Sequence, residues 1–444
     1  MTNHRVDALV IGAGAAGLAA ARELSQSGLR PVVIEARDRI GGRIWTLHDR
    51  NSPLPIELGA EFVHGEAPDT FAIIRAANLI VNELPDVHCQ SHAGNLLPVR
   101  DFWGKMDEVR KDIARKLRRT SGDFSVSDYL KRARLSSADR NMFTNFVQGY
   151  HAAPVDKISA RSLAAGDEET NGQAENKQFR IPSGYDDVVH WLRAGLDPER
   201  VEVRLNTVAT ELCWKRGKVV LRCAIRGGAK LTPFHAPAAI VTIPHALLKA
   251  KTLHIYPELK ERERATELLQ IGQVFKIVLR FRKAFWPDDL NFVHAEGADV
   301  PVWWTALPAR VPVITGWAGG PQAELLLNED EQTRVDKSLA ALAKILALPR
   351  RDIDDLLDGW SMHDWRADPF SRGAYVYVGI GGVPAQNALA KPVEGTLFFA
   401  GEATDPEQTG TVAGAIASGK RAAREAIKVL ASSGRRAVPL SRAK

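Results

Sequence analysis

Three glycines and one acidic residue near the N-terminus have the types and spacing that bind a dinucleotide. Gly12, Gly14 and Gly17 form the pattern G-x-G-x-x-G, and Glu35 follows them. The first glycine permits a tight turn, the second lets the backbone approach a pyrophosphate, and the third lets a helix pack closely on a strand. A carboxylate at the position of Glu35 accepts hydrogen bonds from a ribose. The alternative is a glycine turn that only packs a strand against a helix.

The elements around these glycines must place them at the start of a helix. Residues 6–11 form a short apolar run that fits a buried parallel strand, residues 18–27 fit a helix, and residues 31–34 fit the next strand. A helix that starts at the glycines presents free N–H groups and the positive end of its dipole to a pyrophosphate. This context favours the dinucleotide site over the packing alternative.

A second glycine pair, Gly41 and Gly42, follows Glu35 and precedes Arg43. The extended pattern resembles the FAD fingerprint of the flavin-dependent amine oxidase family, and enzymes that bind NAD do not usually carry it. The guanidinium of Arg43 has the geometry to bond phosphate oxygens in a bidentate manner. The resemblance implies FAD as the cofactor.

Residues 56–65 (IELGAEFVHG) resemble the strand and loop that pass the isoalloxazine ring in this family. Gly59 removes a side chain at a point where we expect the backbone to meet a flat ring. The resemblance implies that residues 58–62 contact the flavin and that His64 lies near the substrate path. The alternative for His64 is a loop histidine that only makes structural hydrogen bonds.

Residues 274–281 alternate with period two, so that Lys276 taken alone is an ordinary solvent-facing strand residue. The longer string at residues 272–287 (GQVFKIVLRFRKAFWP) resembles the family strand whose lysine holds a water beside flavin N5. This context favours a catalytic role for Lys276. The same resemblance places the backbone of Val208 at the adenine.

The C-terminal third carries Trp365 and Tyr375, then a buried strand and glycine turn at residues 396–404, and then a helix that begins near residue 410. The N-terminus of that helix favours a pyrophosphate by the same dipole argument. For catalysis the resemblance implies Lys276, Tyr375, Thr411, Trp365 and His64. For FAD it implies contacts from Gly12, Gly14, Ala15, Ala16, Gly17, Glu35, Ala36, Arg37, Gly42, Arg43, Leu58, Gly59, Ala60, Glu61, Phe62, Val208, Trp365, Gly401, Glu402, Gly410, Thr411, Val412 and Ala415.

Two residues depart from the family pattern. Members with a covalent flavin have a cysteine before the tyrosine of the aromatic cage, and this chain has Ala374 there. Alanine forms no thioether, so we expect non-covalent FAD. Monoamine oxidases have a second cage tyrosine where this chain has Thr411. The site is therefore expected to hold half a cage, with Tyr375 alone, and to favour a secondary or bulkier amine.

Composition excludes several classes of protein. The net charge of +6 over 444 residues comes without a long basic block. Residues 110–119 are the most basic, and their apolar spacing fits a helix with a solvated face, which gives no support for nucleic-acid binding. Three scattered cysteines predict no disulfide framework and a reducing compartment, and the histidines show no metal-ligand spacing. No apolar run is long enough for a membrane span and no signal peptide precedes residue 6, so we expect a soluble cytoplasmic protein.

The resemblance spans most of the chain and implies an α/β fold. This fold has a Rossmann-like FAD-binding domain of the glutathione-reductase type, plus an α+β substrate domain with a mixed sheet and flanking helices. Residues 69–163 show helical periodicity throughout. We expect a FAD-binding domain at residues 1–70, 180–245 and 370–432, a substrate domain at residues 71–179 and 246–369, and a disordered tail at residues 433–444.

The implied reaction is oxidation of a C–N bond in a primary, secondary or polyamine, with hydride transfer to flavin N5. The imine then hydrolyses, and the flavin passes its electrons to O2, giving H2O2, or to another acceptor. No metal is expected, and the protein is expected as a monomer or homodimer. Two alternatives stay open: another FAD oxidoreductase on this scaffold, such as a carotenoid-type desaturase or a protoporphyrinogen oxidase, and a non-catalytic FAD-binding protein. Residues that either line the pocket or belong to the core are Phe102, Trp103, Tyr150, His151, Trp304 and Trp317.

Overall fold

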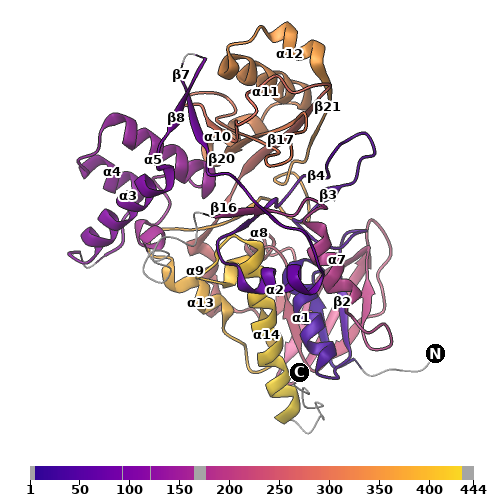
Figure 1. The fold of residues 1–444 in the computed structure, drawn as a ribbon. Coiled ribbons are helices and arrows are strands. Elements are labelled where there is room, and N and C mark those ends of the chain that lie inside the picture. The colour runs from indigo at the N-terminus through magenta and orange to yellow at the C-terminus, as the bar shows by residue number, and fades with distance from the viewer. Residues whose placement is uncertain (1–5, 93, 121, 165–176, 433–444) are drawn as a thin grey trace.

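The computed structural model describes residues 6–92, 94–120, 122–164 and 177–432 (Figure 1). The tail predicted at residues 433–444 lies outside these ranges. The fold is α/β, as expected, and is built around two larger sheets.

A five-stranded parallel sheet carries the glycine loop. In spatial order its strands are β10 (Glu202–Arg204), β2 (Pro31–Ile34), β1 (Ala8–Ile11), β14 (Ala239–Val241) and β23 (Leu397–Phe399). Alternation along β1 sends Ala8 and Val10 to one face, and Leu9 and Ile11 to the other. Both faces are covered, which explains why the strands are apolar throughout.

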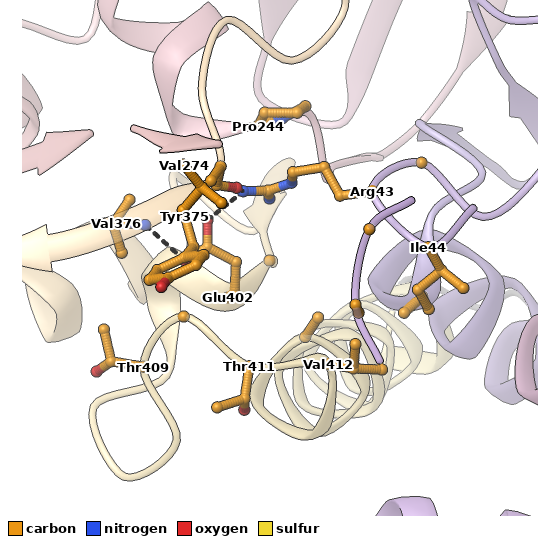
Figure 2. A pocket seen from close by; sticks show the side chains of 18 of the residues that line it. Arg43, Ile44, Pro244, Val274, Tyr375, Val376, Glu402, Thr409, Thr411 and Val412 are labelled. Carbon is orange, nitrogen blue, oxygen red and sulfur yellow. Dashed lines mark hydrogen bonds and ion pairs between the residues drawn. The ribbon is translucent and has the colours of Figure 1, made fainter. Parts of the chain in front are cut away.

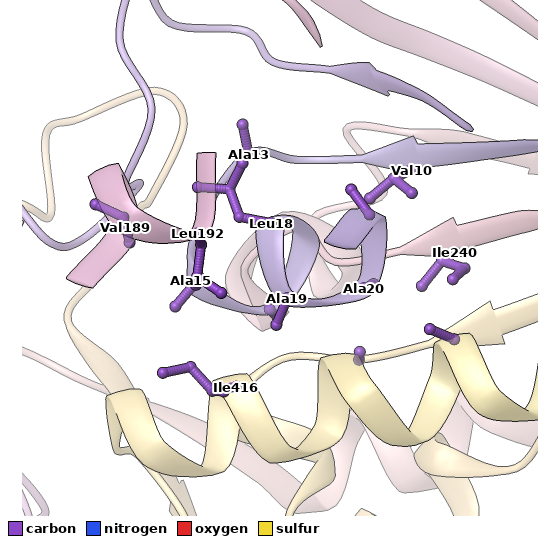
Figure 3. Packing of buried hydrophobic residues seen from close by; sticks show 14 of the residues in the cluster. Val10, Ala13, Ala15, Leu18, Ala19, Ala20, Val189, Leu192, Ile240 and Ile416 are labelled. Atoms are coloured by element: carbon purple, nitrogen blue, oxygen red, sulfur yellow. The ribbon is translucent and has the colours of Figure 1, made fainter. Parts of the chain in front are cut away.

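Helices cover the first face, namely α1 (Ala15–Gln26), α2 (Pro68–Ala76), α7 (Asp186–Ala194) and α14 (Val412–Ser432). Figure 3 shows the small residues of α1 lying against α14. At the contact, a Cβ added to Gly419 would lie 2.2 Å from the carbonyl oxygen of Ala16, so only glycine allows this approach. The second face packs on a sheet of β13 (Phe234–Ala236), β12 (Lys218–Ile225), β11 (Thr207–Lys215) and β15 (His254–Tyr256).

The second large sheet is mixed and has seven strands. In spatial order they are β21 (Leu357–Met362), β17 (Val274–Phe281), β20 (Val313–Gly319), β19 (Val302–Thr305), β18 (Phe292–His294), β7 (His88–His92) and β8 (Asn95–Val99). Its core is shared with α10 (Gly320–Leu327), α11 (Glu331–Leu346) and α12 (Arg350–Leu356), which lie at the top of Figure 1. The strands of the two large sheets fall within the ranges expected for the two domains, whose boundaries stay a prediction.

The prediction of helix throughout residues 69–163 is wrong in part. Helices α3 (Phe102–Leu117), α4 (Val126–Arg132) and α5 (Ser137–Tyr150) form, but β6 (Asn82–Glu83), β7 and β8 do not fit it. Strands β7 and β8 form an antiparallel hairpin, with Gly94 at φ +84° between them. Their backbone groups extend the seven-stranded sheet through β18, and that long-range pairing overrides the local periodicity.

The expected solvated face of residues 110–119 is also wrong at one position. Arg110 is 4% exposed, and its guanidinium lies over the Phe146 ring at 5.3 Å from the centroid. The arginine sits on the apolar side of α3, where an aromatic face and Asp107 accompany its charge.

The remaining elements are short and lie outside the two large sheets. They are β3 (Thr46–Leu47), β4 (Ile56–Glu57), β5 (Phe62–His64), β9 (Gln178–Arg180), α8 (His245–Lys249), α9 (Lys260–Leu268), β16 (Leu269–Gly272), β22 (Tyr375–Val378), α13 (Val383–Ala390) and the 3-10 helix η1 (Glu402–Thr404).

Candidate active site

A single cavity of about 1380 Å³ brings together residues that lie far apart in the sequence. It is lined by every residue predicted to contact FAD or to act in catalysis, with the exception of Gly17. A Cβ on Gly17 would lie 1.9 Å from the carbonyl oxygen of Gly12, so this glycine serves the packing of α1 on β1. Its assignment as a cofactor contact is therefore corrected.

The glycine loop forms an open cradle at the start of α1. Gly12 has φ +112° and Gly42 has φ +61°, conformations that favour glycine. Gly14 is the N-cap of α1, without a side-chain cap, and it forms a parallel bridge with Gly41. A helix start of this kind suits a phosphate.

Glu35 lies at the end of β2 and is almost fully buried. Its carboxylate accepts hydrogen bonds from the backbone N–H groups of Ala13 at 2.7 Å and Arg37 at 2.9 Å. Burial raises the pKa of Glu35 above its usual value. These bonds hold the carboxylate beside the glycine loop, where the ribose of a dinucleotide is expected.

Two arginines expected at the cofactor have protein partners. Arg37 donates to Asp368 at 2.7 Å and to Ser371 at 2.8 Å. The Nη1 atom of Arg43 donates to Glu402 at 2.9 Å, as Figure 2 shows. The same atom also donates to the carbonyl oxygen of Ala374. One arm of the Arg43 fork is thus engaged by protein, and its bonding to a phosphate stays a prediction.

Contacts within the protein already require glycine at position 59, and the expected approach of its backbone to a flat ring stays a prediction. A Cβ there would lie 1.9 Å from the carbonyl oxygen of Arg43 and 3.2 Å from the Trp365 ring. The close backbone approach therefore requires glycine. Trp365 is 4% exposed and donates its indole N–H to the carbonyl oxygen of Leu58 at 2.9 Å.

Lys276 lies in a buried ion network in the cavity wall. Its Nζ is 2.7 Å from a carboxylate oxygen of Glu61 and donates to the carbonyl oxygen of Gly59 at 3.1 Å. Arg180 and the indole N–H of Trp304 donate to the other oxygen of Glu61, at 2.7 Å and 3.0 Å. The solvent-facing interpretation of Lys276 is wrong, because the residue is 4% exposed.

Burial alone raises the pKa of Glu61, but the charges of Lys276 and Arg180 and their hydrogen bonds outweigh it and lower the pKa to about 2. The carboxylate is therefore ionised at any physiological pH. Glu61 joins the two cations into one unit in the cavity wall.

Tyr375 and Thr411 both line the cavity, but their hydroxyls have protein partners. Tyr375 donates to the carbonyl oxygen of Tyr150 at 2.8 Å, and burial raises the Tyr375 pKa above its usual range. Thr411 donates to the carbonyl oxygen of Gln408 at 2.8 Å and accepts from the N–H of Gly414 at 3.0 Å. Thr411 is thus the N-cap of α14, as its place in Figure 2 shows.

One part of the cavity wall is aromatic. The six residues considered as pocket or core all line it: Phe102, Trp103, Tyr150, His151, Trp304 and Trp317. Ring contacts join them to Phe62, Phe146 and Phe292. His64 lies in this part, with its Nδ1 atom 3.4 Å from the hydroxyl of Tyr150.

Sequence reasoning missed three polar residues in or next to this part of the wall, and one of them, Arg180, lies outside the cavity lining. Arg180 pairs with Glu61, and His88 and His294 line the cavity with their rings stacked and a nitrogen–nitrogen distance of 2.9 Å. Burial lowers the pKa of His294 to about 3, so the ring is neutral. No local pattern marks these residues, because their partners are distant in the sequence.

The residues present fit FAD. A dinucleotide binds to a glycine cradle at a helix start and to an acid for the ribose, and Gly14 and Glu35 provide these in the cavity. Val412 adds a second helix start to the lining of the same cavity. Gly401, at φ +134°, would place a Cβ into open space of the same cavity. Ala374 in the wall offers no sulfur for a covalent link. Within the described residues, no helix is both long and apolar enough to cross a membrane.

Comparisons with known proteins agree with this geometry. The family model "Flavin containing amine oxidoreductase" matches residues 15–427. Polyamine oxidase 3 of Oryza sativa subsp. japonica is 30% identical, in a match that covers 95% of this chain and 89% of the relative. Lysine-specific histone demethylase 1 homolog 3 of Arabidopsis thaliana is 27% identical over 96% of this chain, which spans only 30% of that relative.

Solved structures share the fold. Putrescine oxidase bound to putrescine has a TM-score of 0.81 and 21% identity, with 96% of this chain and 99% of that chain covered. Cyclohexylamine oxidase from Brevibacterium oxydans IH-35A has a TM-score of 0.80 and 20% identity, with 96% and 100% covered. The chain belongs to the family of flavin-containing amine oxidoreductases, as an FAD-dependent amine oxidase.

Proposed function

We propose that this protein oxidises the C–N bond of a primary, secondary or polyamine to an imine, which water then hydrolyses. FAD, when bound, takes up the electron pair and hydrogen that leave the amine α-carbon, and O2 takes the electrons on to H2O2. The observation that carries the proposal is that Lys276 and Tyr375 share one cavity with the glycine loop and Glu35. The contacts assigned to FAD above are part of this proposal.

The aromatic wall acts on the protonation state of the amine. Tyr375 and Trp365 exclude water beside the reacting group, and desolvation lowers the pKa of an amine and favours its reactive neutral form. The faces of the same rings attract an ammonium ion, which opposes this effect. The wall therefore binds the cation on entry and favours its deprotonation once water is excluded.

We assign Lys276 the role of a fixed positive charge and not that of a proton acceptor from the amine. Its ammonium is fixed by Glu61 and Gly59, so it presents a localised positive charge in a buried wall. Such a charge stabilises negative charge that develops nearby, as on O2 when it accepts electrons. We assign Lys276 to the oxygen half of the reaction.

Anaerobic mixing of the FAD-loaded protein with a panel of amines tests the proposal. We expect the absorbance of oxidised flavin to fall with at least one amine, and a carbonyl product to appear after the imine hydrolyses. Admission of air should then restore the absorbance and produce H2O2. Chemical reduction with dithionite is the control that the bound flavin is reducible. If dithionite bleaches the flavin and no amine does, the proposal is wrong.

A further inference from the structure

The carboxylates around the cavity indicate which class of amine the protein oxidises. This inference rests on the proposed function. We propose that the substrate is a monoamine with a bulky apolar skeleton, such as an arylalkylamine or an alicyclic amine, rather than a diamine or polyamine. A polyamine carries further ammonium groups, and each of them needs a carboxylate or a comparable acceptor when it leaves water.

Among the described residues, five glutamates line the cavity: Glu35, Glu61, Glu66, Glu402 and Glu407. Glu35 is bonded to two N–H groups beside the glycine loop, and Glu402 is paired with Arg43. Both are therefore committed at the part of the cavity assigned to FAD. Glu66 and Glu407 are exposed to solvent, where water screens the attraction between charges.

Among the glutamates that line the cavity, Glu61 is the buried one beside the aromatic residues. Both of its carboxylate oxygens already have partners. One oxygen faces Lys276, and the other accepts from Arg180 and Trp304. Lys276 lines the cavity and Arg180 lies outside its lining, so two cations and one anion give the cluster around Glu61 a net positive charge. Burial raises the pKa of neighbouring Glu57 to about 7, so its carboxyl group compensates that charge only in part at neutral pH. A second ammonium would meet net repulsion here. The described residues of this part offer it no free carboxylate, and the unpartnered side-chain oxygen of Gln178 and ring nitrogen of His151 are neutral acceptors only.

The rest of this part of the cavity suits an apolar group. Phe62 contacts Trp304 at 5.4 Å between centroids, Trp304 contacts Trp317 at 5.8 Å, and Phe146 stacks on Tyr150 at 5.2 Å. Burial lowers the pKa of His151 to about 3, so that ring is uncharged. Continuous aromatic walls bind a ring or a branched hydrocarbon by burial of apolar area.

A matched pair of amines isolates the second charge. n-Hexylamine and hexamethylenediamine have the same carbon chain and differ in one terminal ammonium. We expect the Kd and the kcat/KM to favour the monoamine by at least about tenfold, since a smaller difference is within the effect of minor contacts. 2-Phenylethylamine and cyclohexylamine should exceed n-hexylamine, and spermidine should be the poorest substrate. Equal or better binding and oxidation of the diamine and spermidine would overturn the inference.

A carboxylate added to the cavity wall should weaken the preference for the monoamine. Asn145 lies on α5, is half-buried and lines the cavity, so Asn145→Asp introduces a charge with almost no change of shape. We expect it to narrow the monoamine-to-diamine ratio at least about threefold. Asn95→Asp, on the exposed surface of β8, is the matched control and should leave the ratio unchanged. If the natural protein binds diamines and Glu66→Gln abolishes that binding, Glu66 anchors a second ammonium and the inference fails.

The inference and the proposed function fail in different ways. Quenching of the fluorescence of the cavity tryptophans gives a Kd for each amine without turnover. If no amine reduces the flavin, the proposed function is wrong, and the ratio of the two Kd values still decides between monoamine and diamine. If diamines reduce the flavin efficiently and monoamines do not, only the inference is wrong.

Discussion

At the scale of single residues, Lys276 lies on β17 with its ammonium 2.7 Å from Glu61 and 3.1 Å from the carbonyl oxygen of Gly59. Alternation along the strand explains which way the side chain points. It does not explain the burial, which comes from the segment between β4 and β5 that covers this face of the strand. The oxygen-related role that we assign to Lys276 needs a fixed, buried charge, and this network provides it.

Replacement of Lys276 by Met should slow the reaction of reduced FAD with O2 by at least about tenfold, because the positive charge near the reacting oxygen is lost. FAD should stay bound, since Glu61 keeps its bonds to Arg180 and Trp304. Stopped-flow mixing of the reduced enzyme with O2 measures the rate, and Lys344→Met on the exposed surface of α11 is the control. An unchanged rate would remove the assigned role.

Glu57 and Glu61 show how neighbours in the chain acquire opposite properties. Burial raises the pKa of Glu57 to about 7, where only neutral donors, the hydroxyl of Thr46 and the N–H of Tyr185, bond its oxygens. The pKa of Glu61 falls to about 2, because two cations outweigh the effect of burial. The difference lies in the partners that the fold supplies.

The ion pairs of Glu61 with Lys276 and Arg180 should make the free energy of unfolding depend on pH. The pKa of Glu61 in the folded state, about 2, lies below its ordinary value of 4.5. Its stabilising effect is therefore complete above pH 4.5 and is lost as the pH falls towards 2, by about 3 kcal/mol in total.

We expect Glu61→Gln to lower the free energy of unfolding by about 3 kcal/mol at neutral pH, with a deficit relative to the natural protein that shrinks in acid. Urea unfolding across this pH range measures the effect, with Glu108→Gln on the exposed face of α3 as the control. A deficit that stays constant with pH would contradict the assignment.

At the scale of elements, the start of α14 combines two functions. Thr411 lines the cavity and also caps the helix through the N–H of Gly414. The resemblance implied catalytic and FAD-contact roles for Thr411 in place of a cage tyrosine, and it did not indicate the cap. The cap fixes where α14 begins and therefore where its N-terminal N–H groups meet the cavity.

Thr411→Val should cost about 1 kcal/mol of unfolding free energy, because it keeps the shape of the side chain and removes the capping oxygen. Thr411→Ser should retain most of the stability, since serine caps equally well. Thermal or urea unfolding of both variants, with FAD loaded, compares them. If valine is as stable as threonine, the hydroxyl contributes nothing as a cap.

At the scale of the whole molecule, the cavity lies where the glycine loop, the start of α14 and the inner strands of the seven-stranded sheet meet. Because FAD contacts are assigned to segments from residue 12 to residue 415, a bound cofactor should connect most of the fold. Only the folded state offers this site, so FAD is expected to stabilise it by mass action.

Free FAD at about 100 times its Kd should add about 2.7 kcal/mol to the free energy of unfolding and raise the Tm of the FAD-free protein. Because Ala374 forms no thioether, all flavin should pass into the soluble fraction when the loaded protein is denatured by acid. Spectra of the supernatant and the pellet measure the release. Flavin retained on the denatured chain would show a covalent bond and contradict the prediction.

The sequence by itself determined the features that depend on neighbours in the chain. The glycine spacing predicted the cradle at α1, period two predicted β17, and Ala374 excluded a thioether. Only the tertiary structure decided the features that depend on contact between distant segments. It joined Lys276 to Glu61, engaged Arg43 with Glu402, and drew β7 and β8 into a sheet. Turn and strand preferences act over a few residues, whereas the partner of a buried charge depends on which segments pack against it. For this reason a dinucleotide site could be predicted from local pattern, and the resemblance of that pattern to the family fingerprint implied FAD. The charge around Glu61, and with it the inference about the substrate, required the fold.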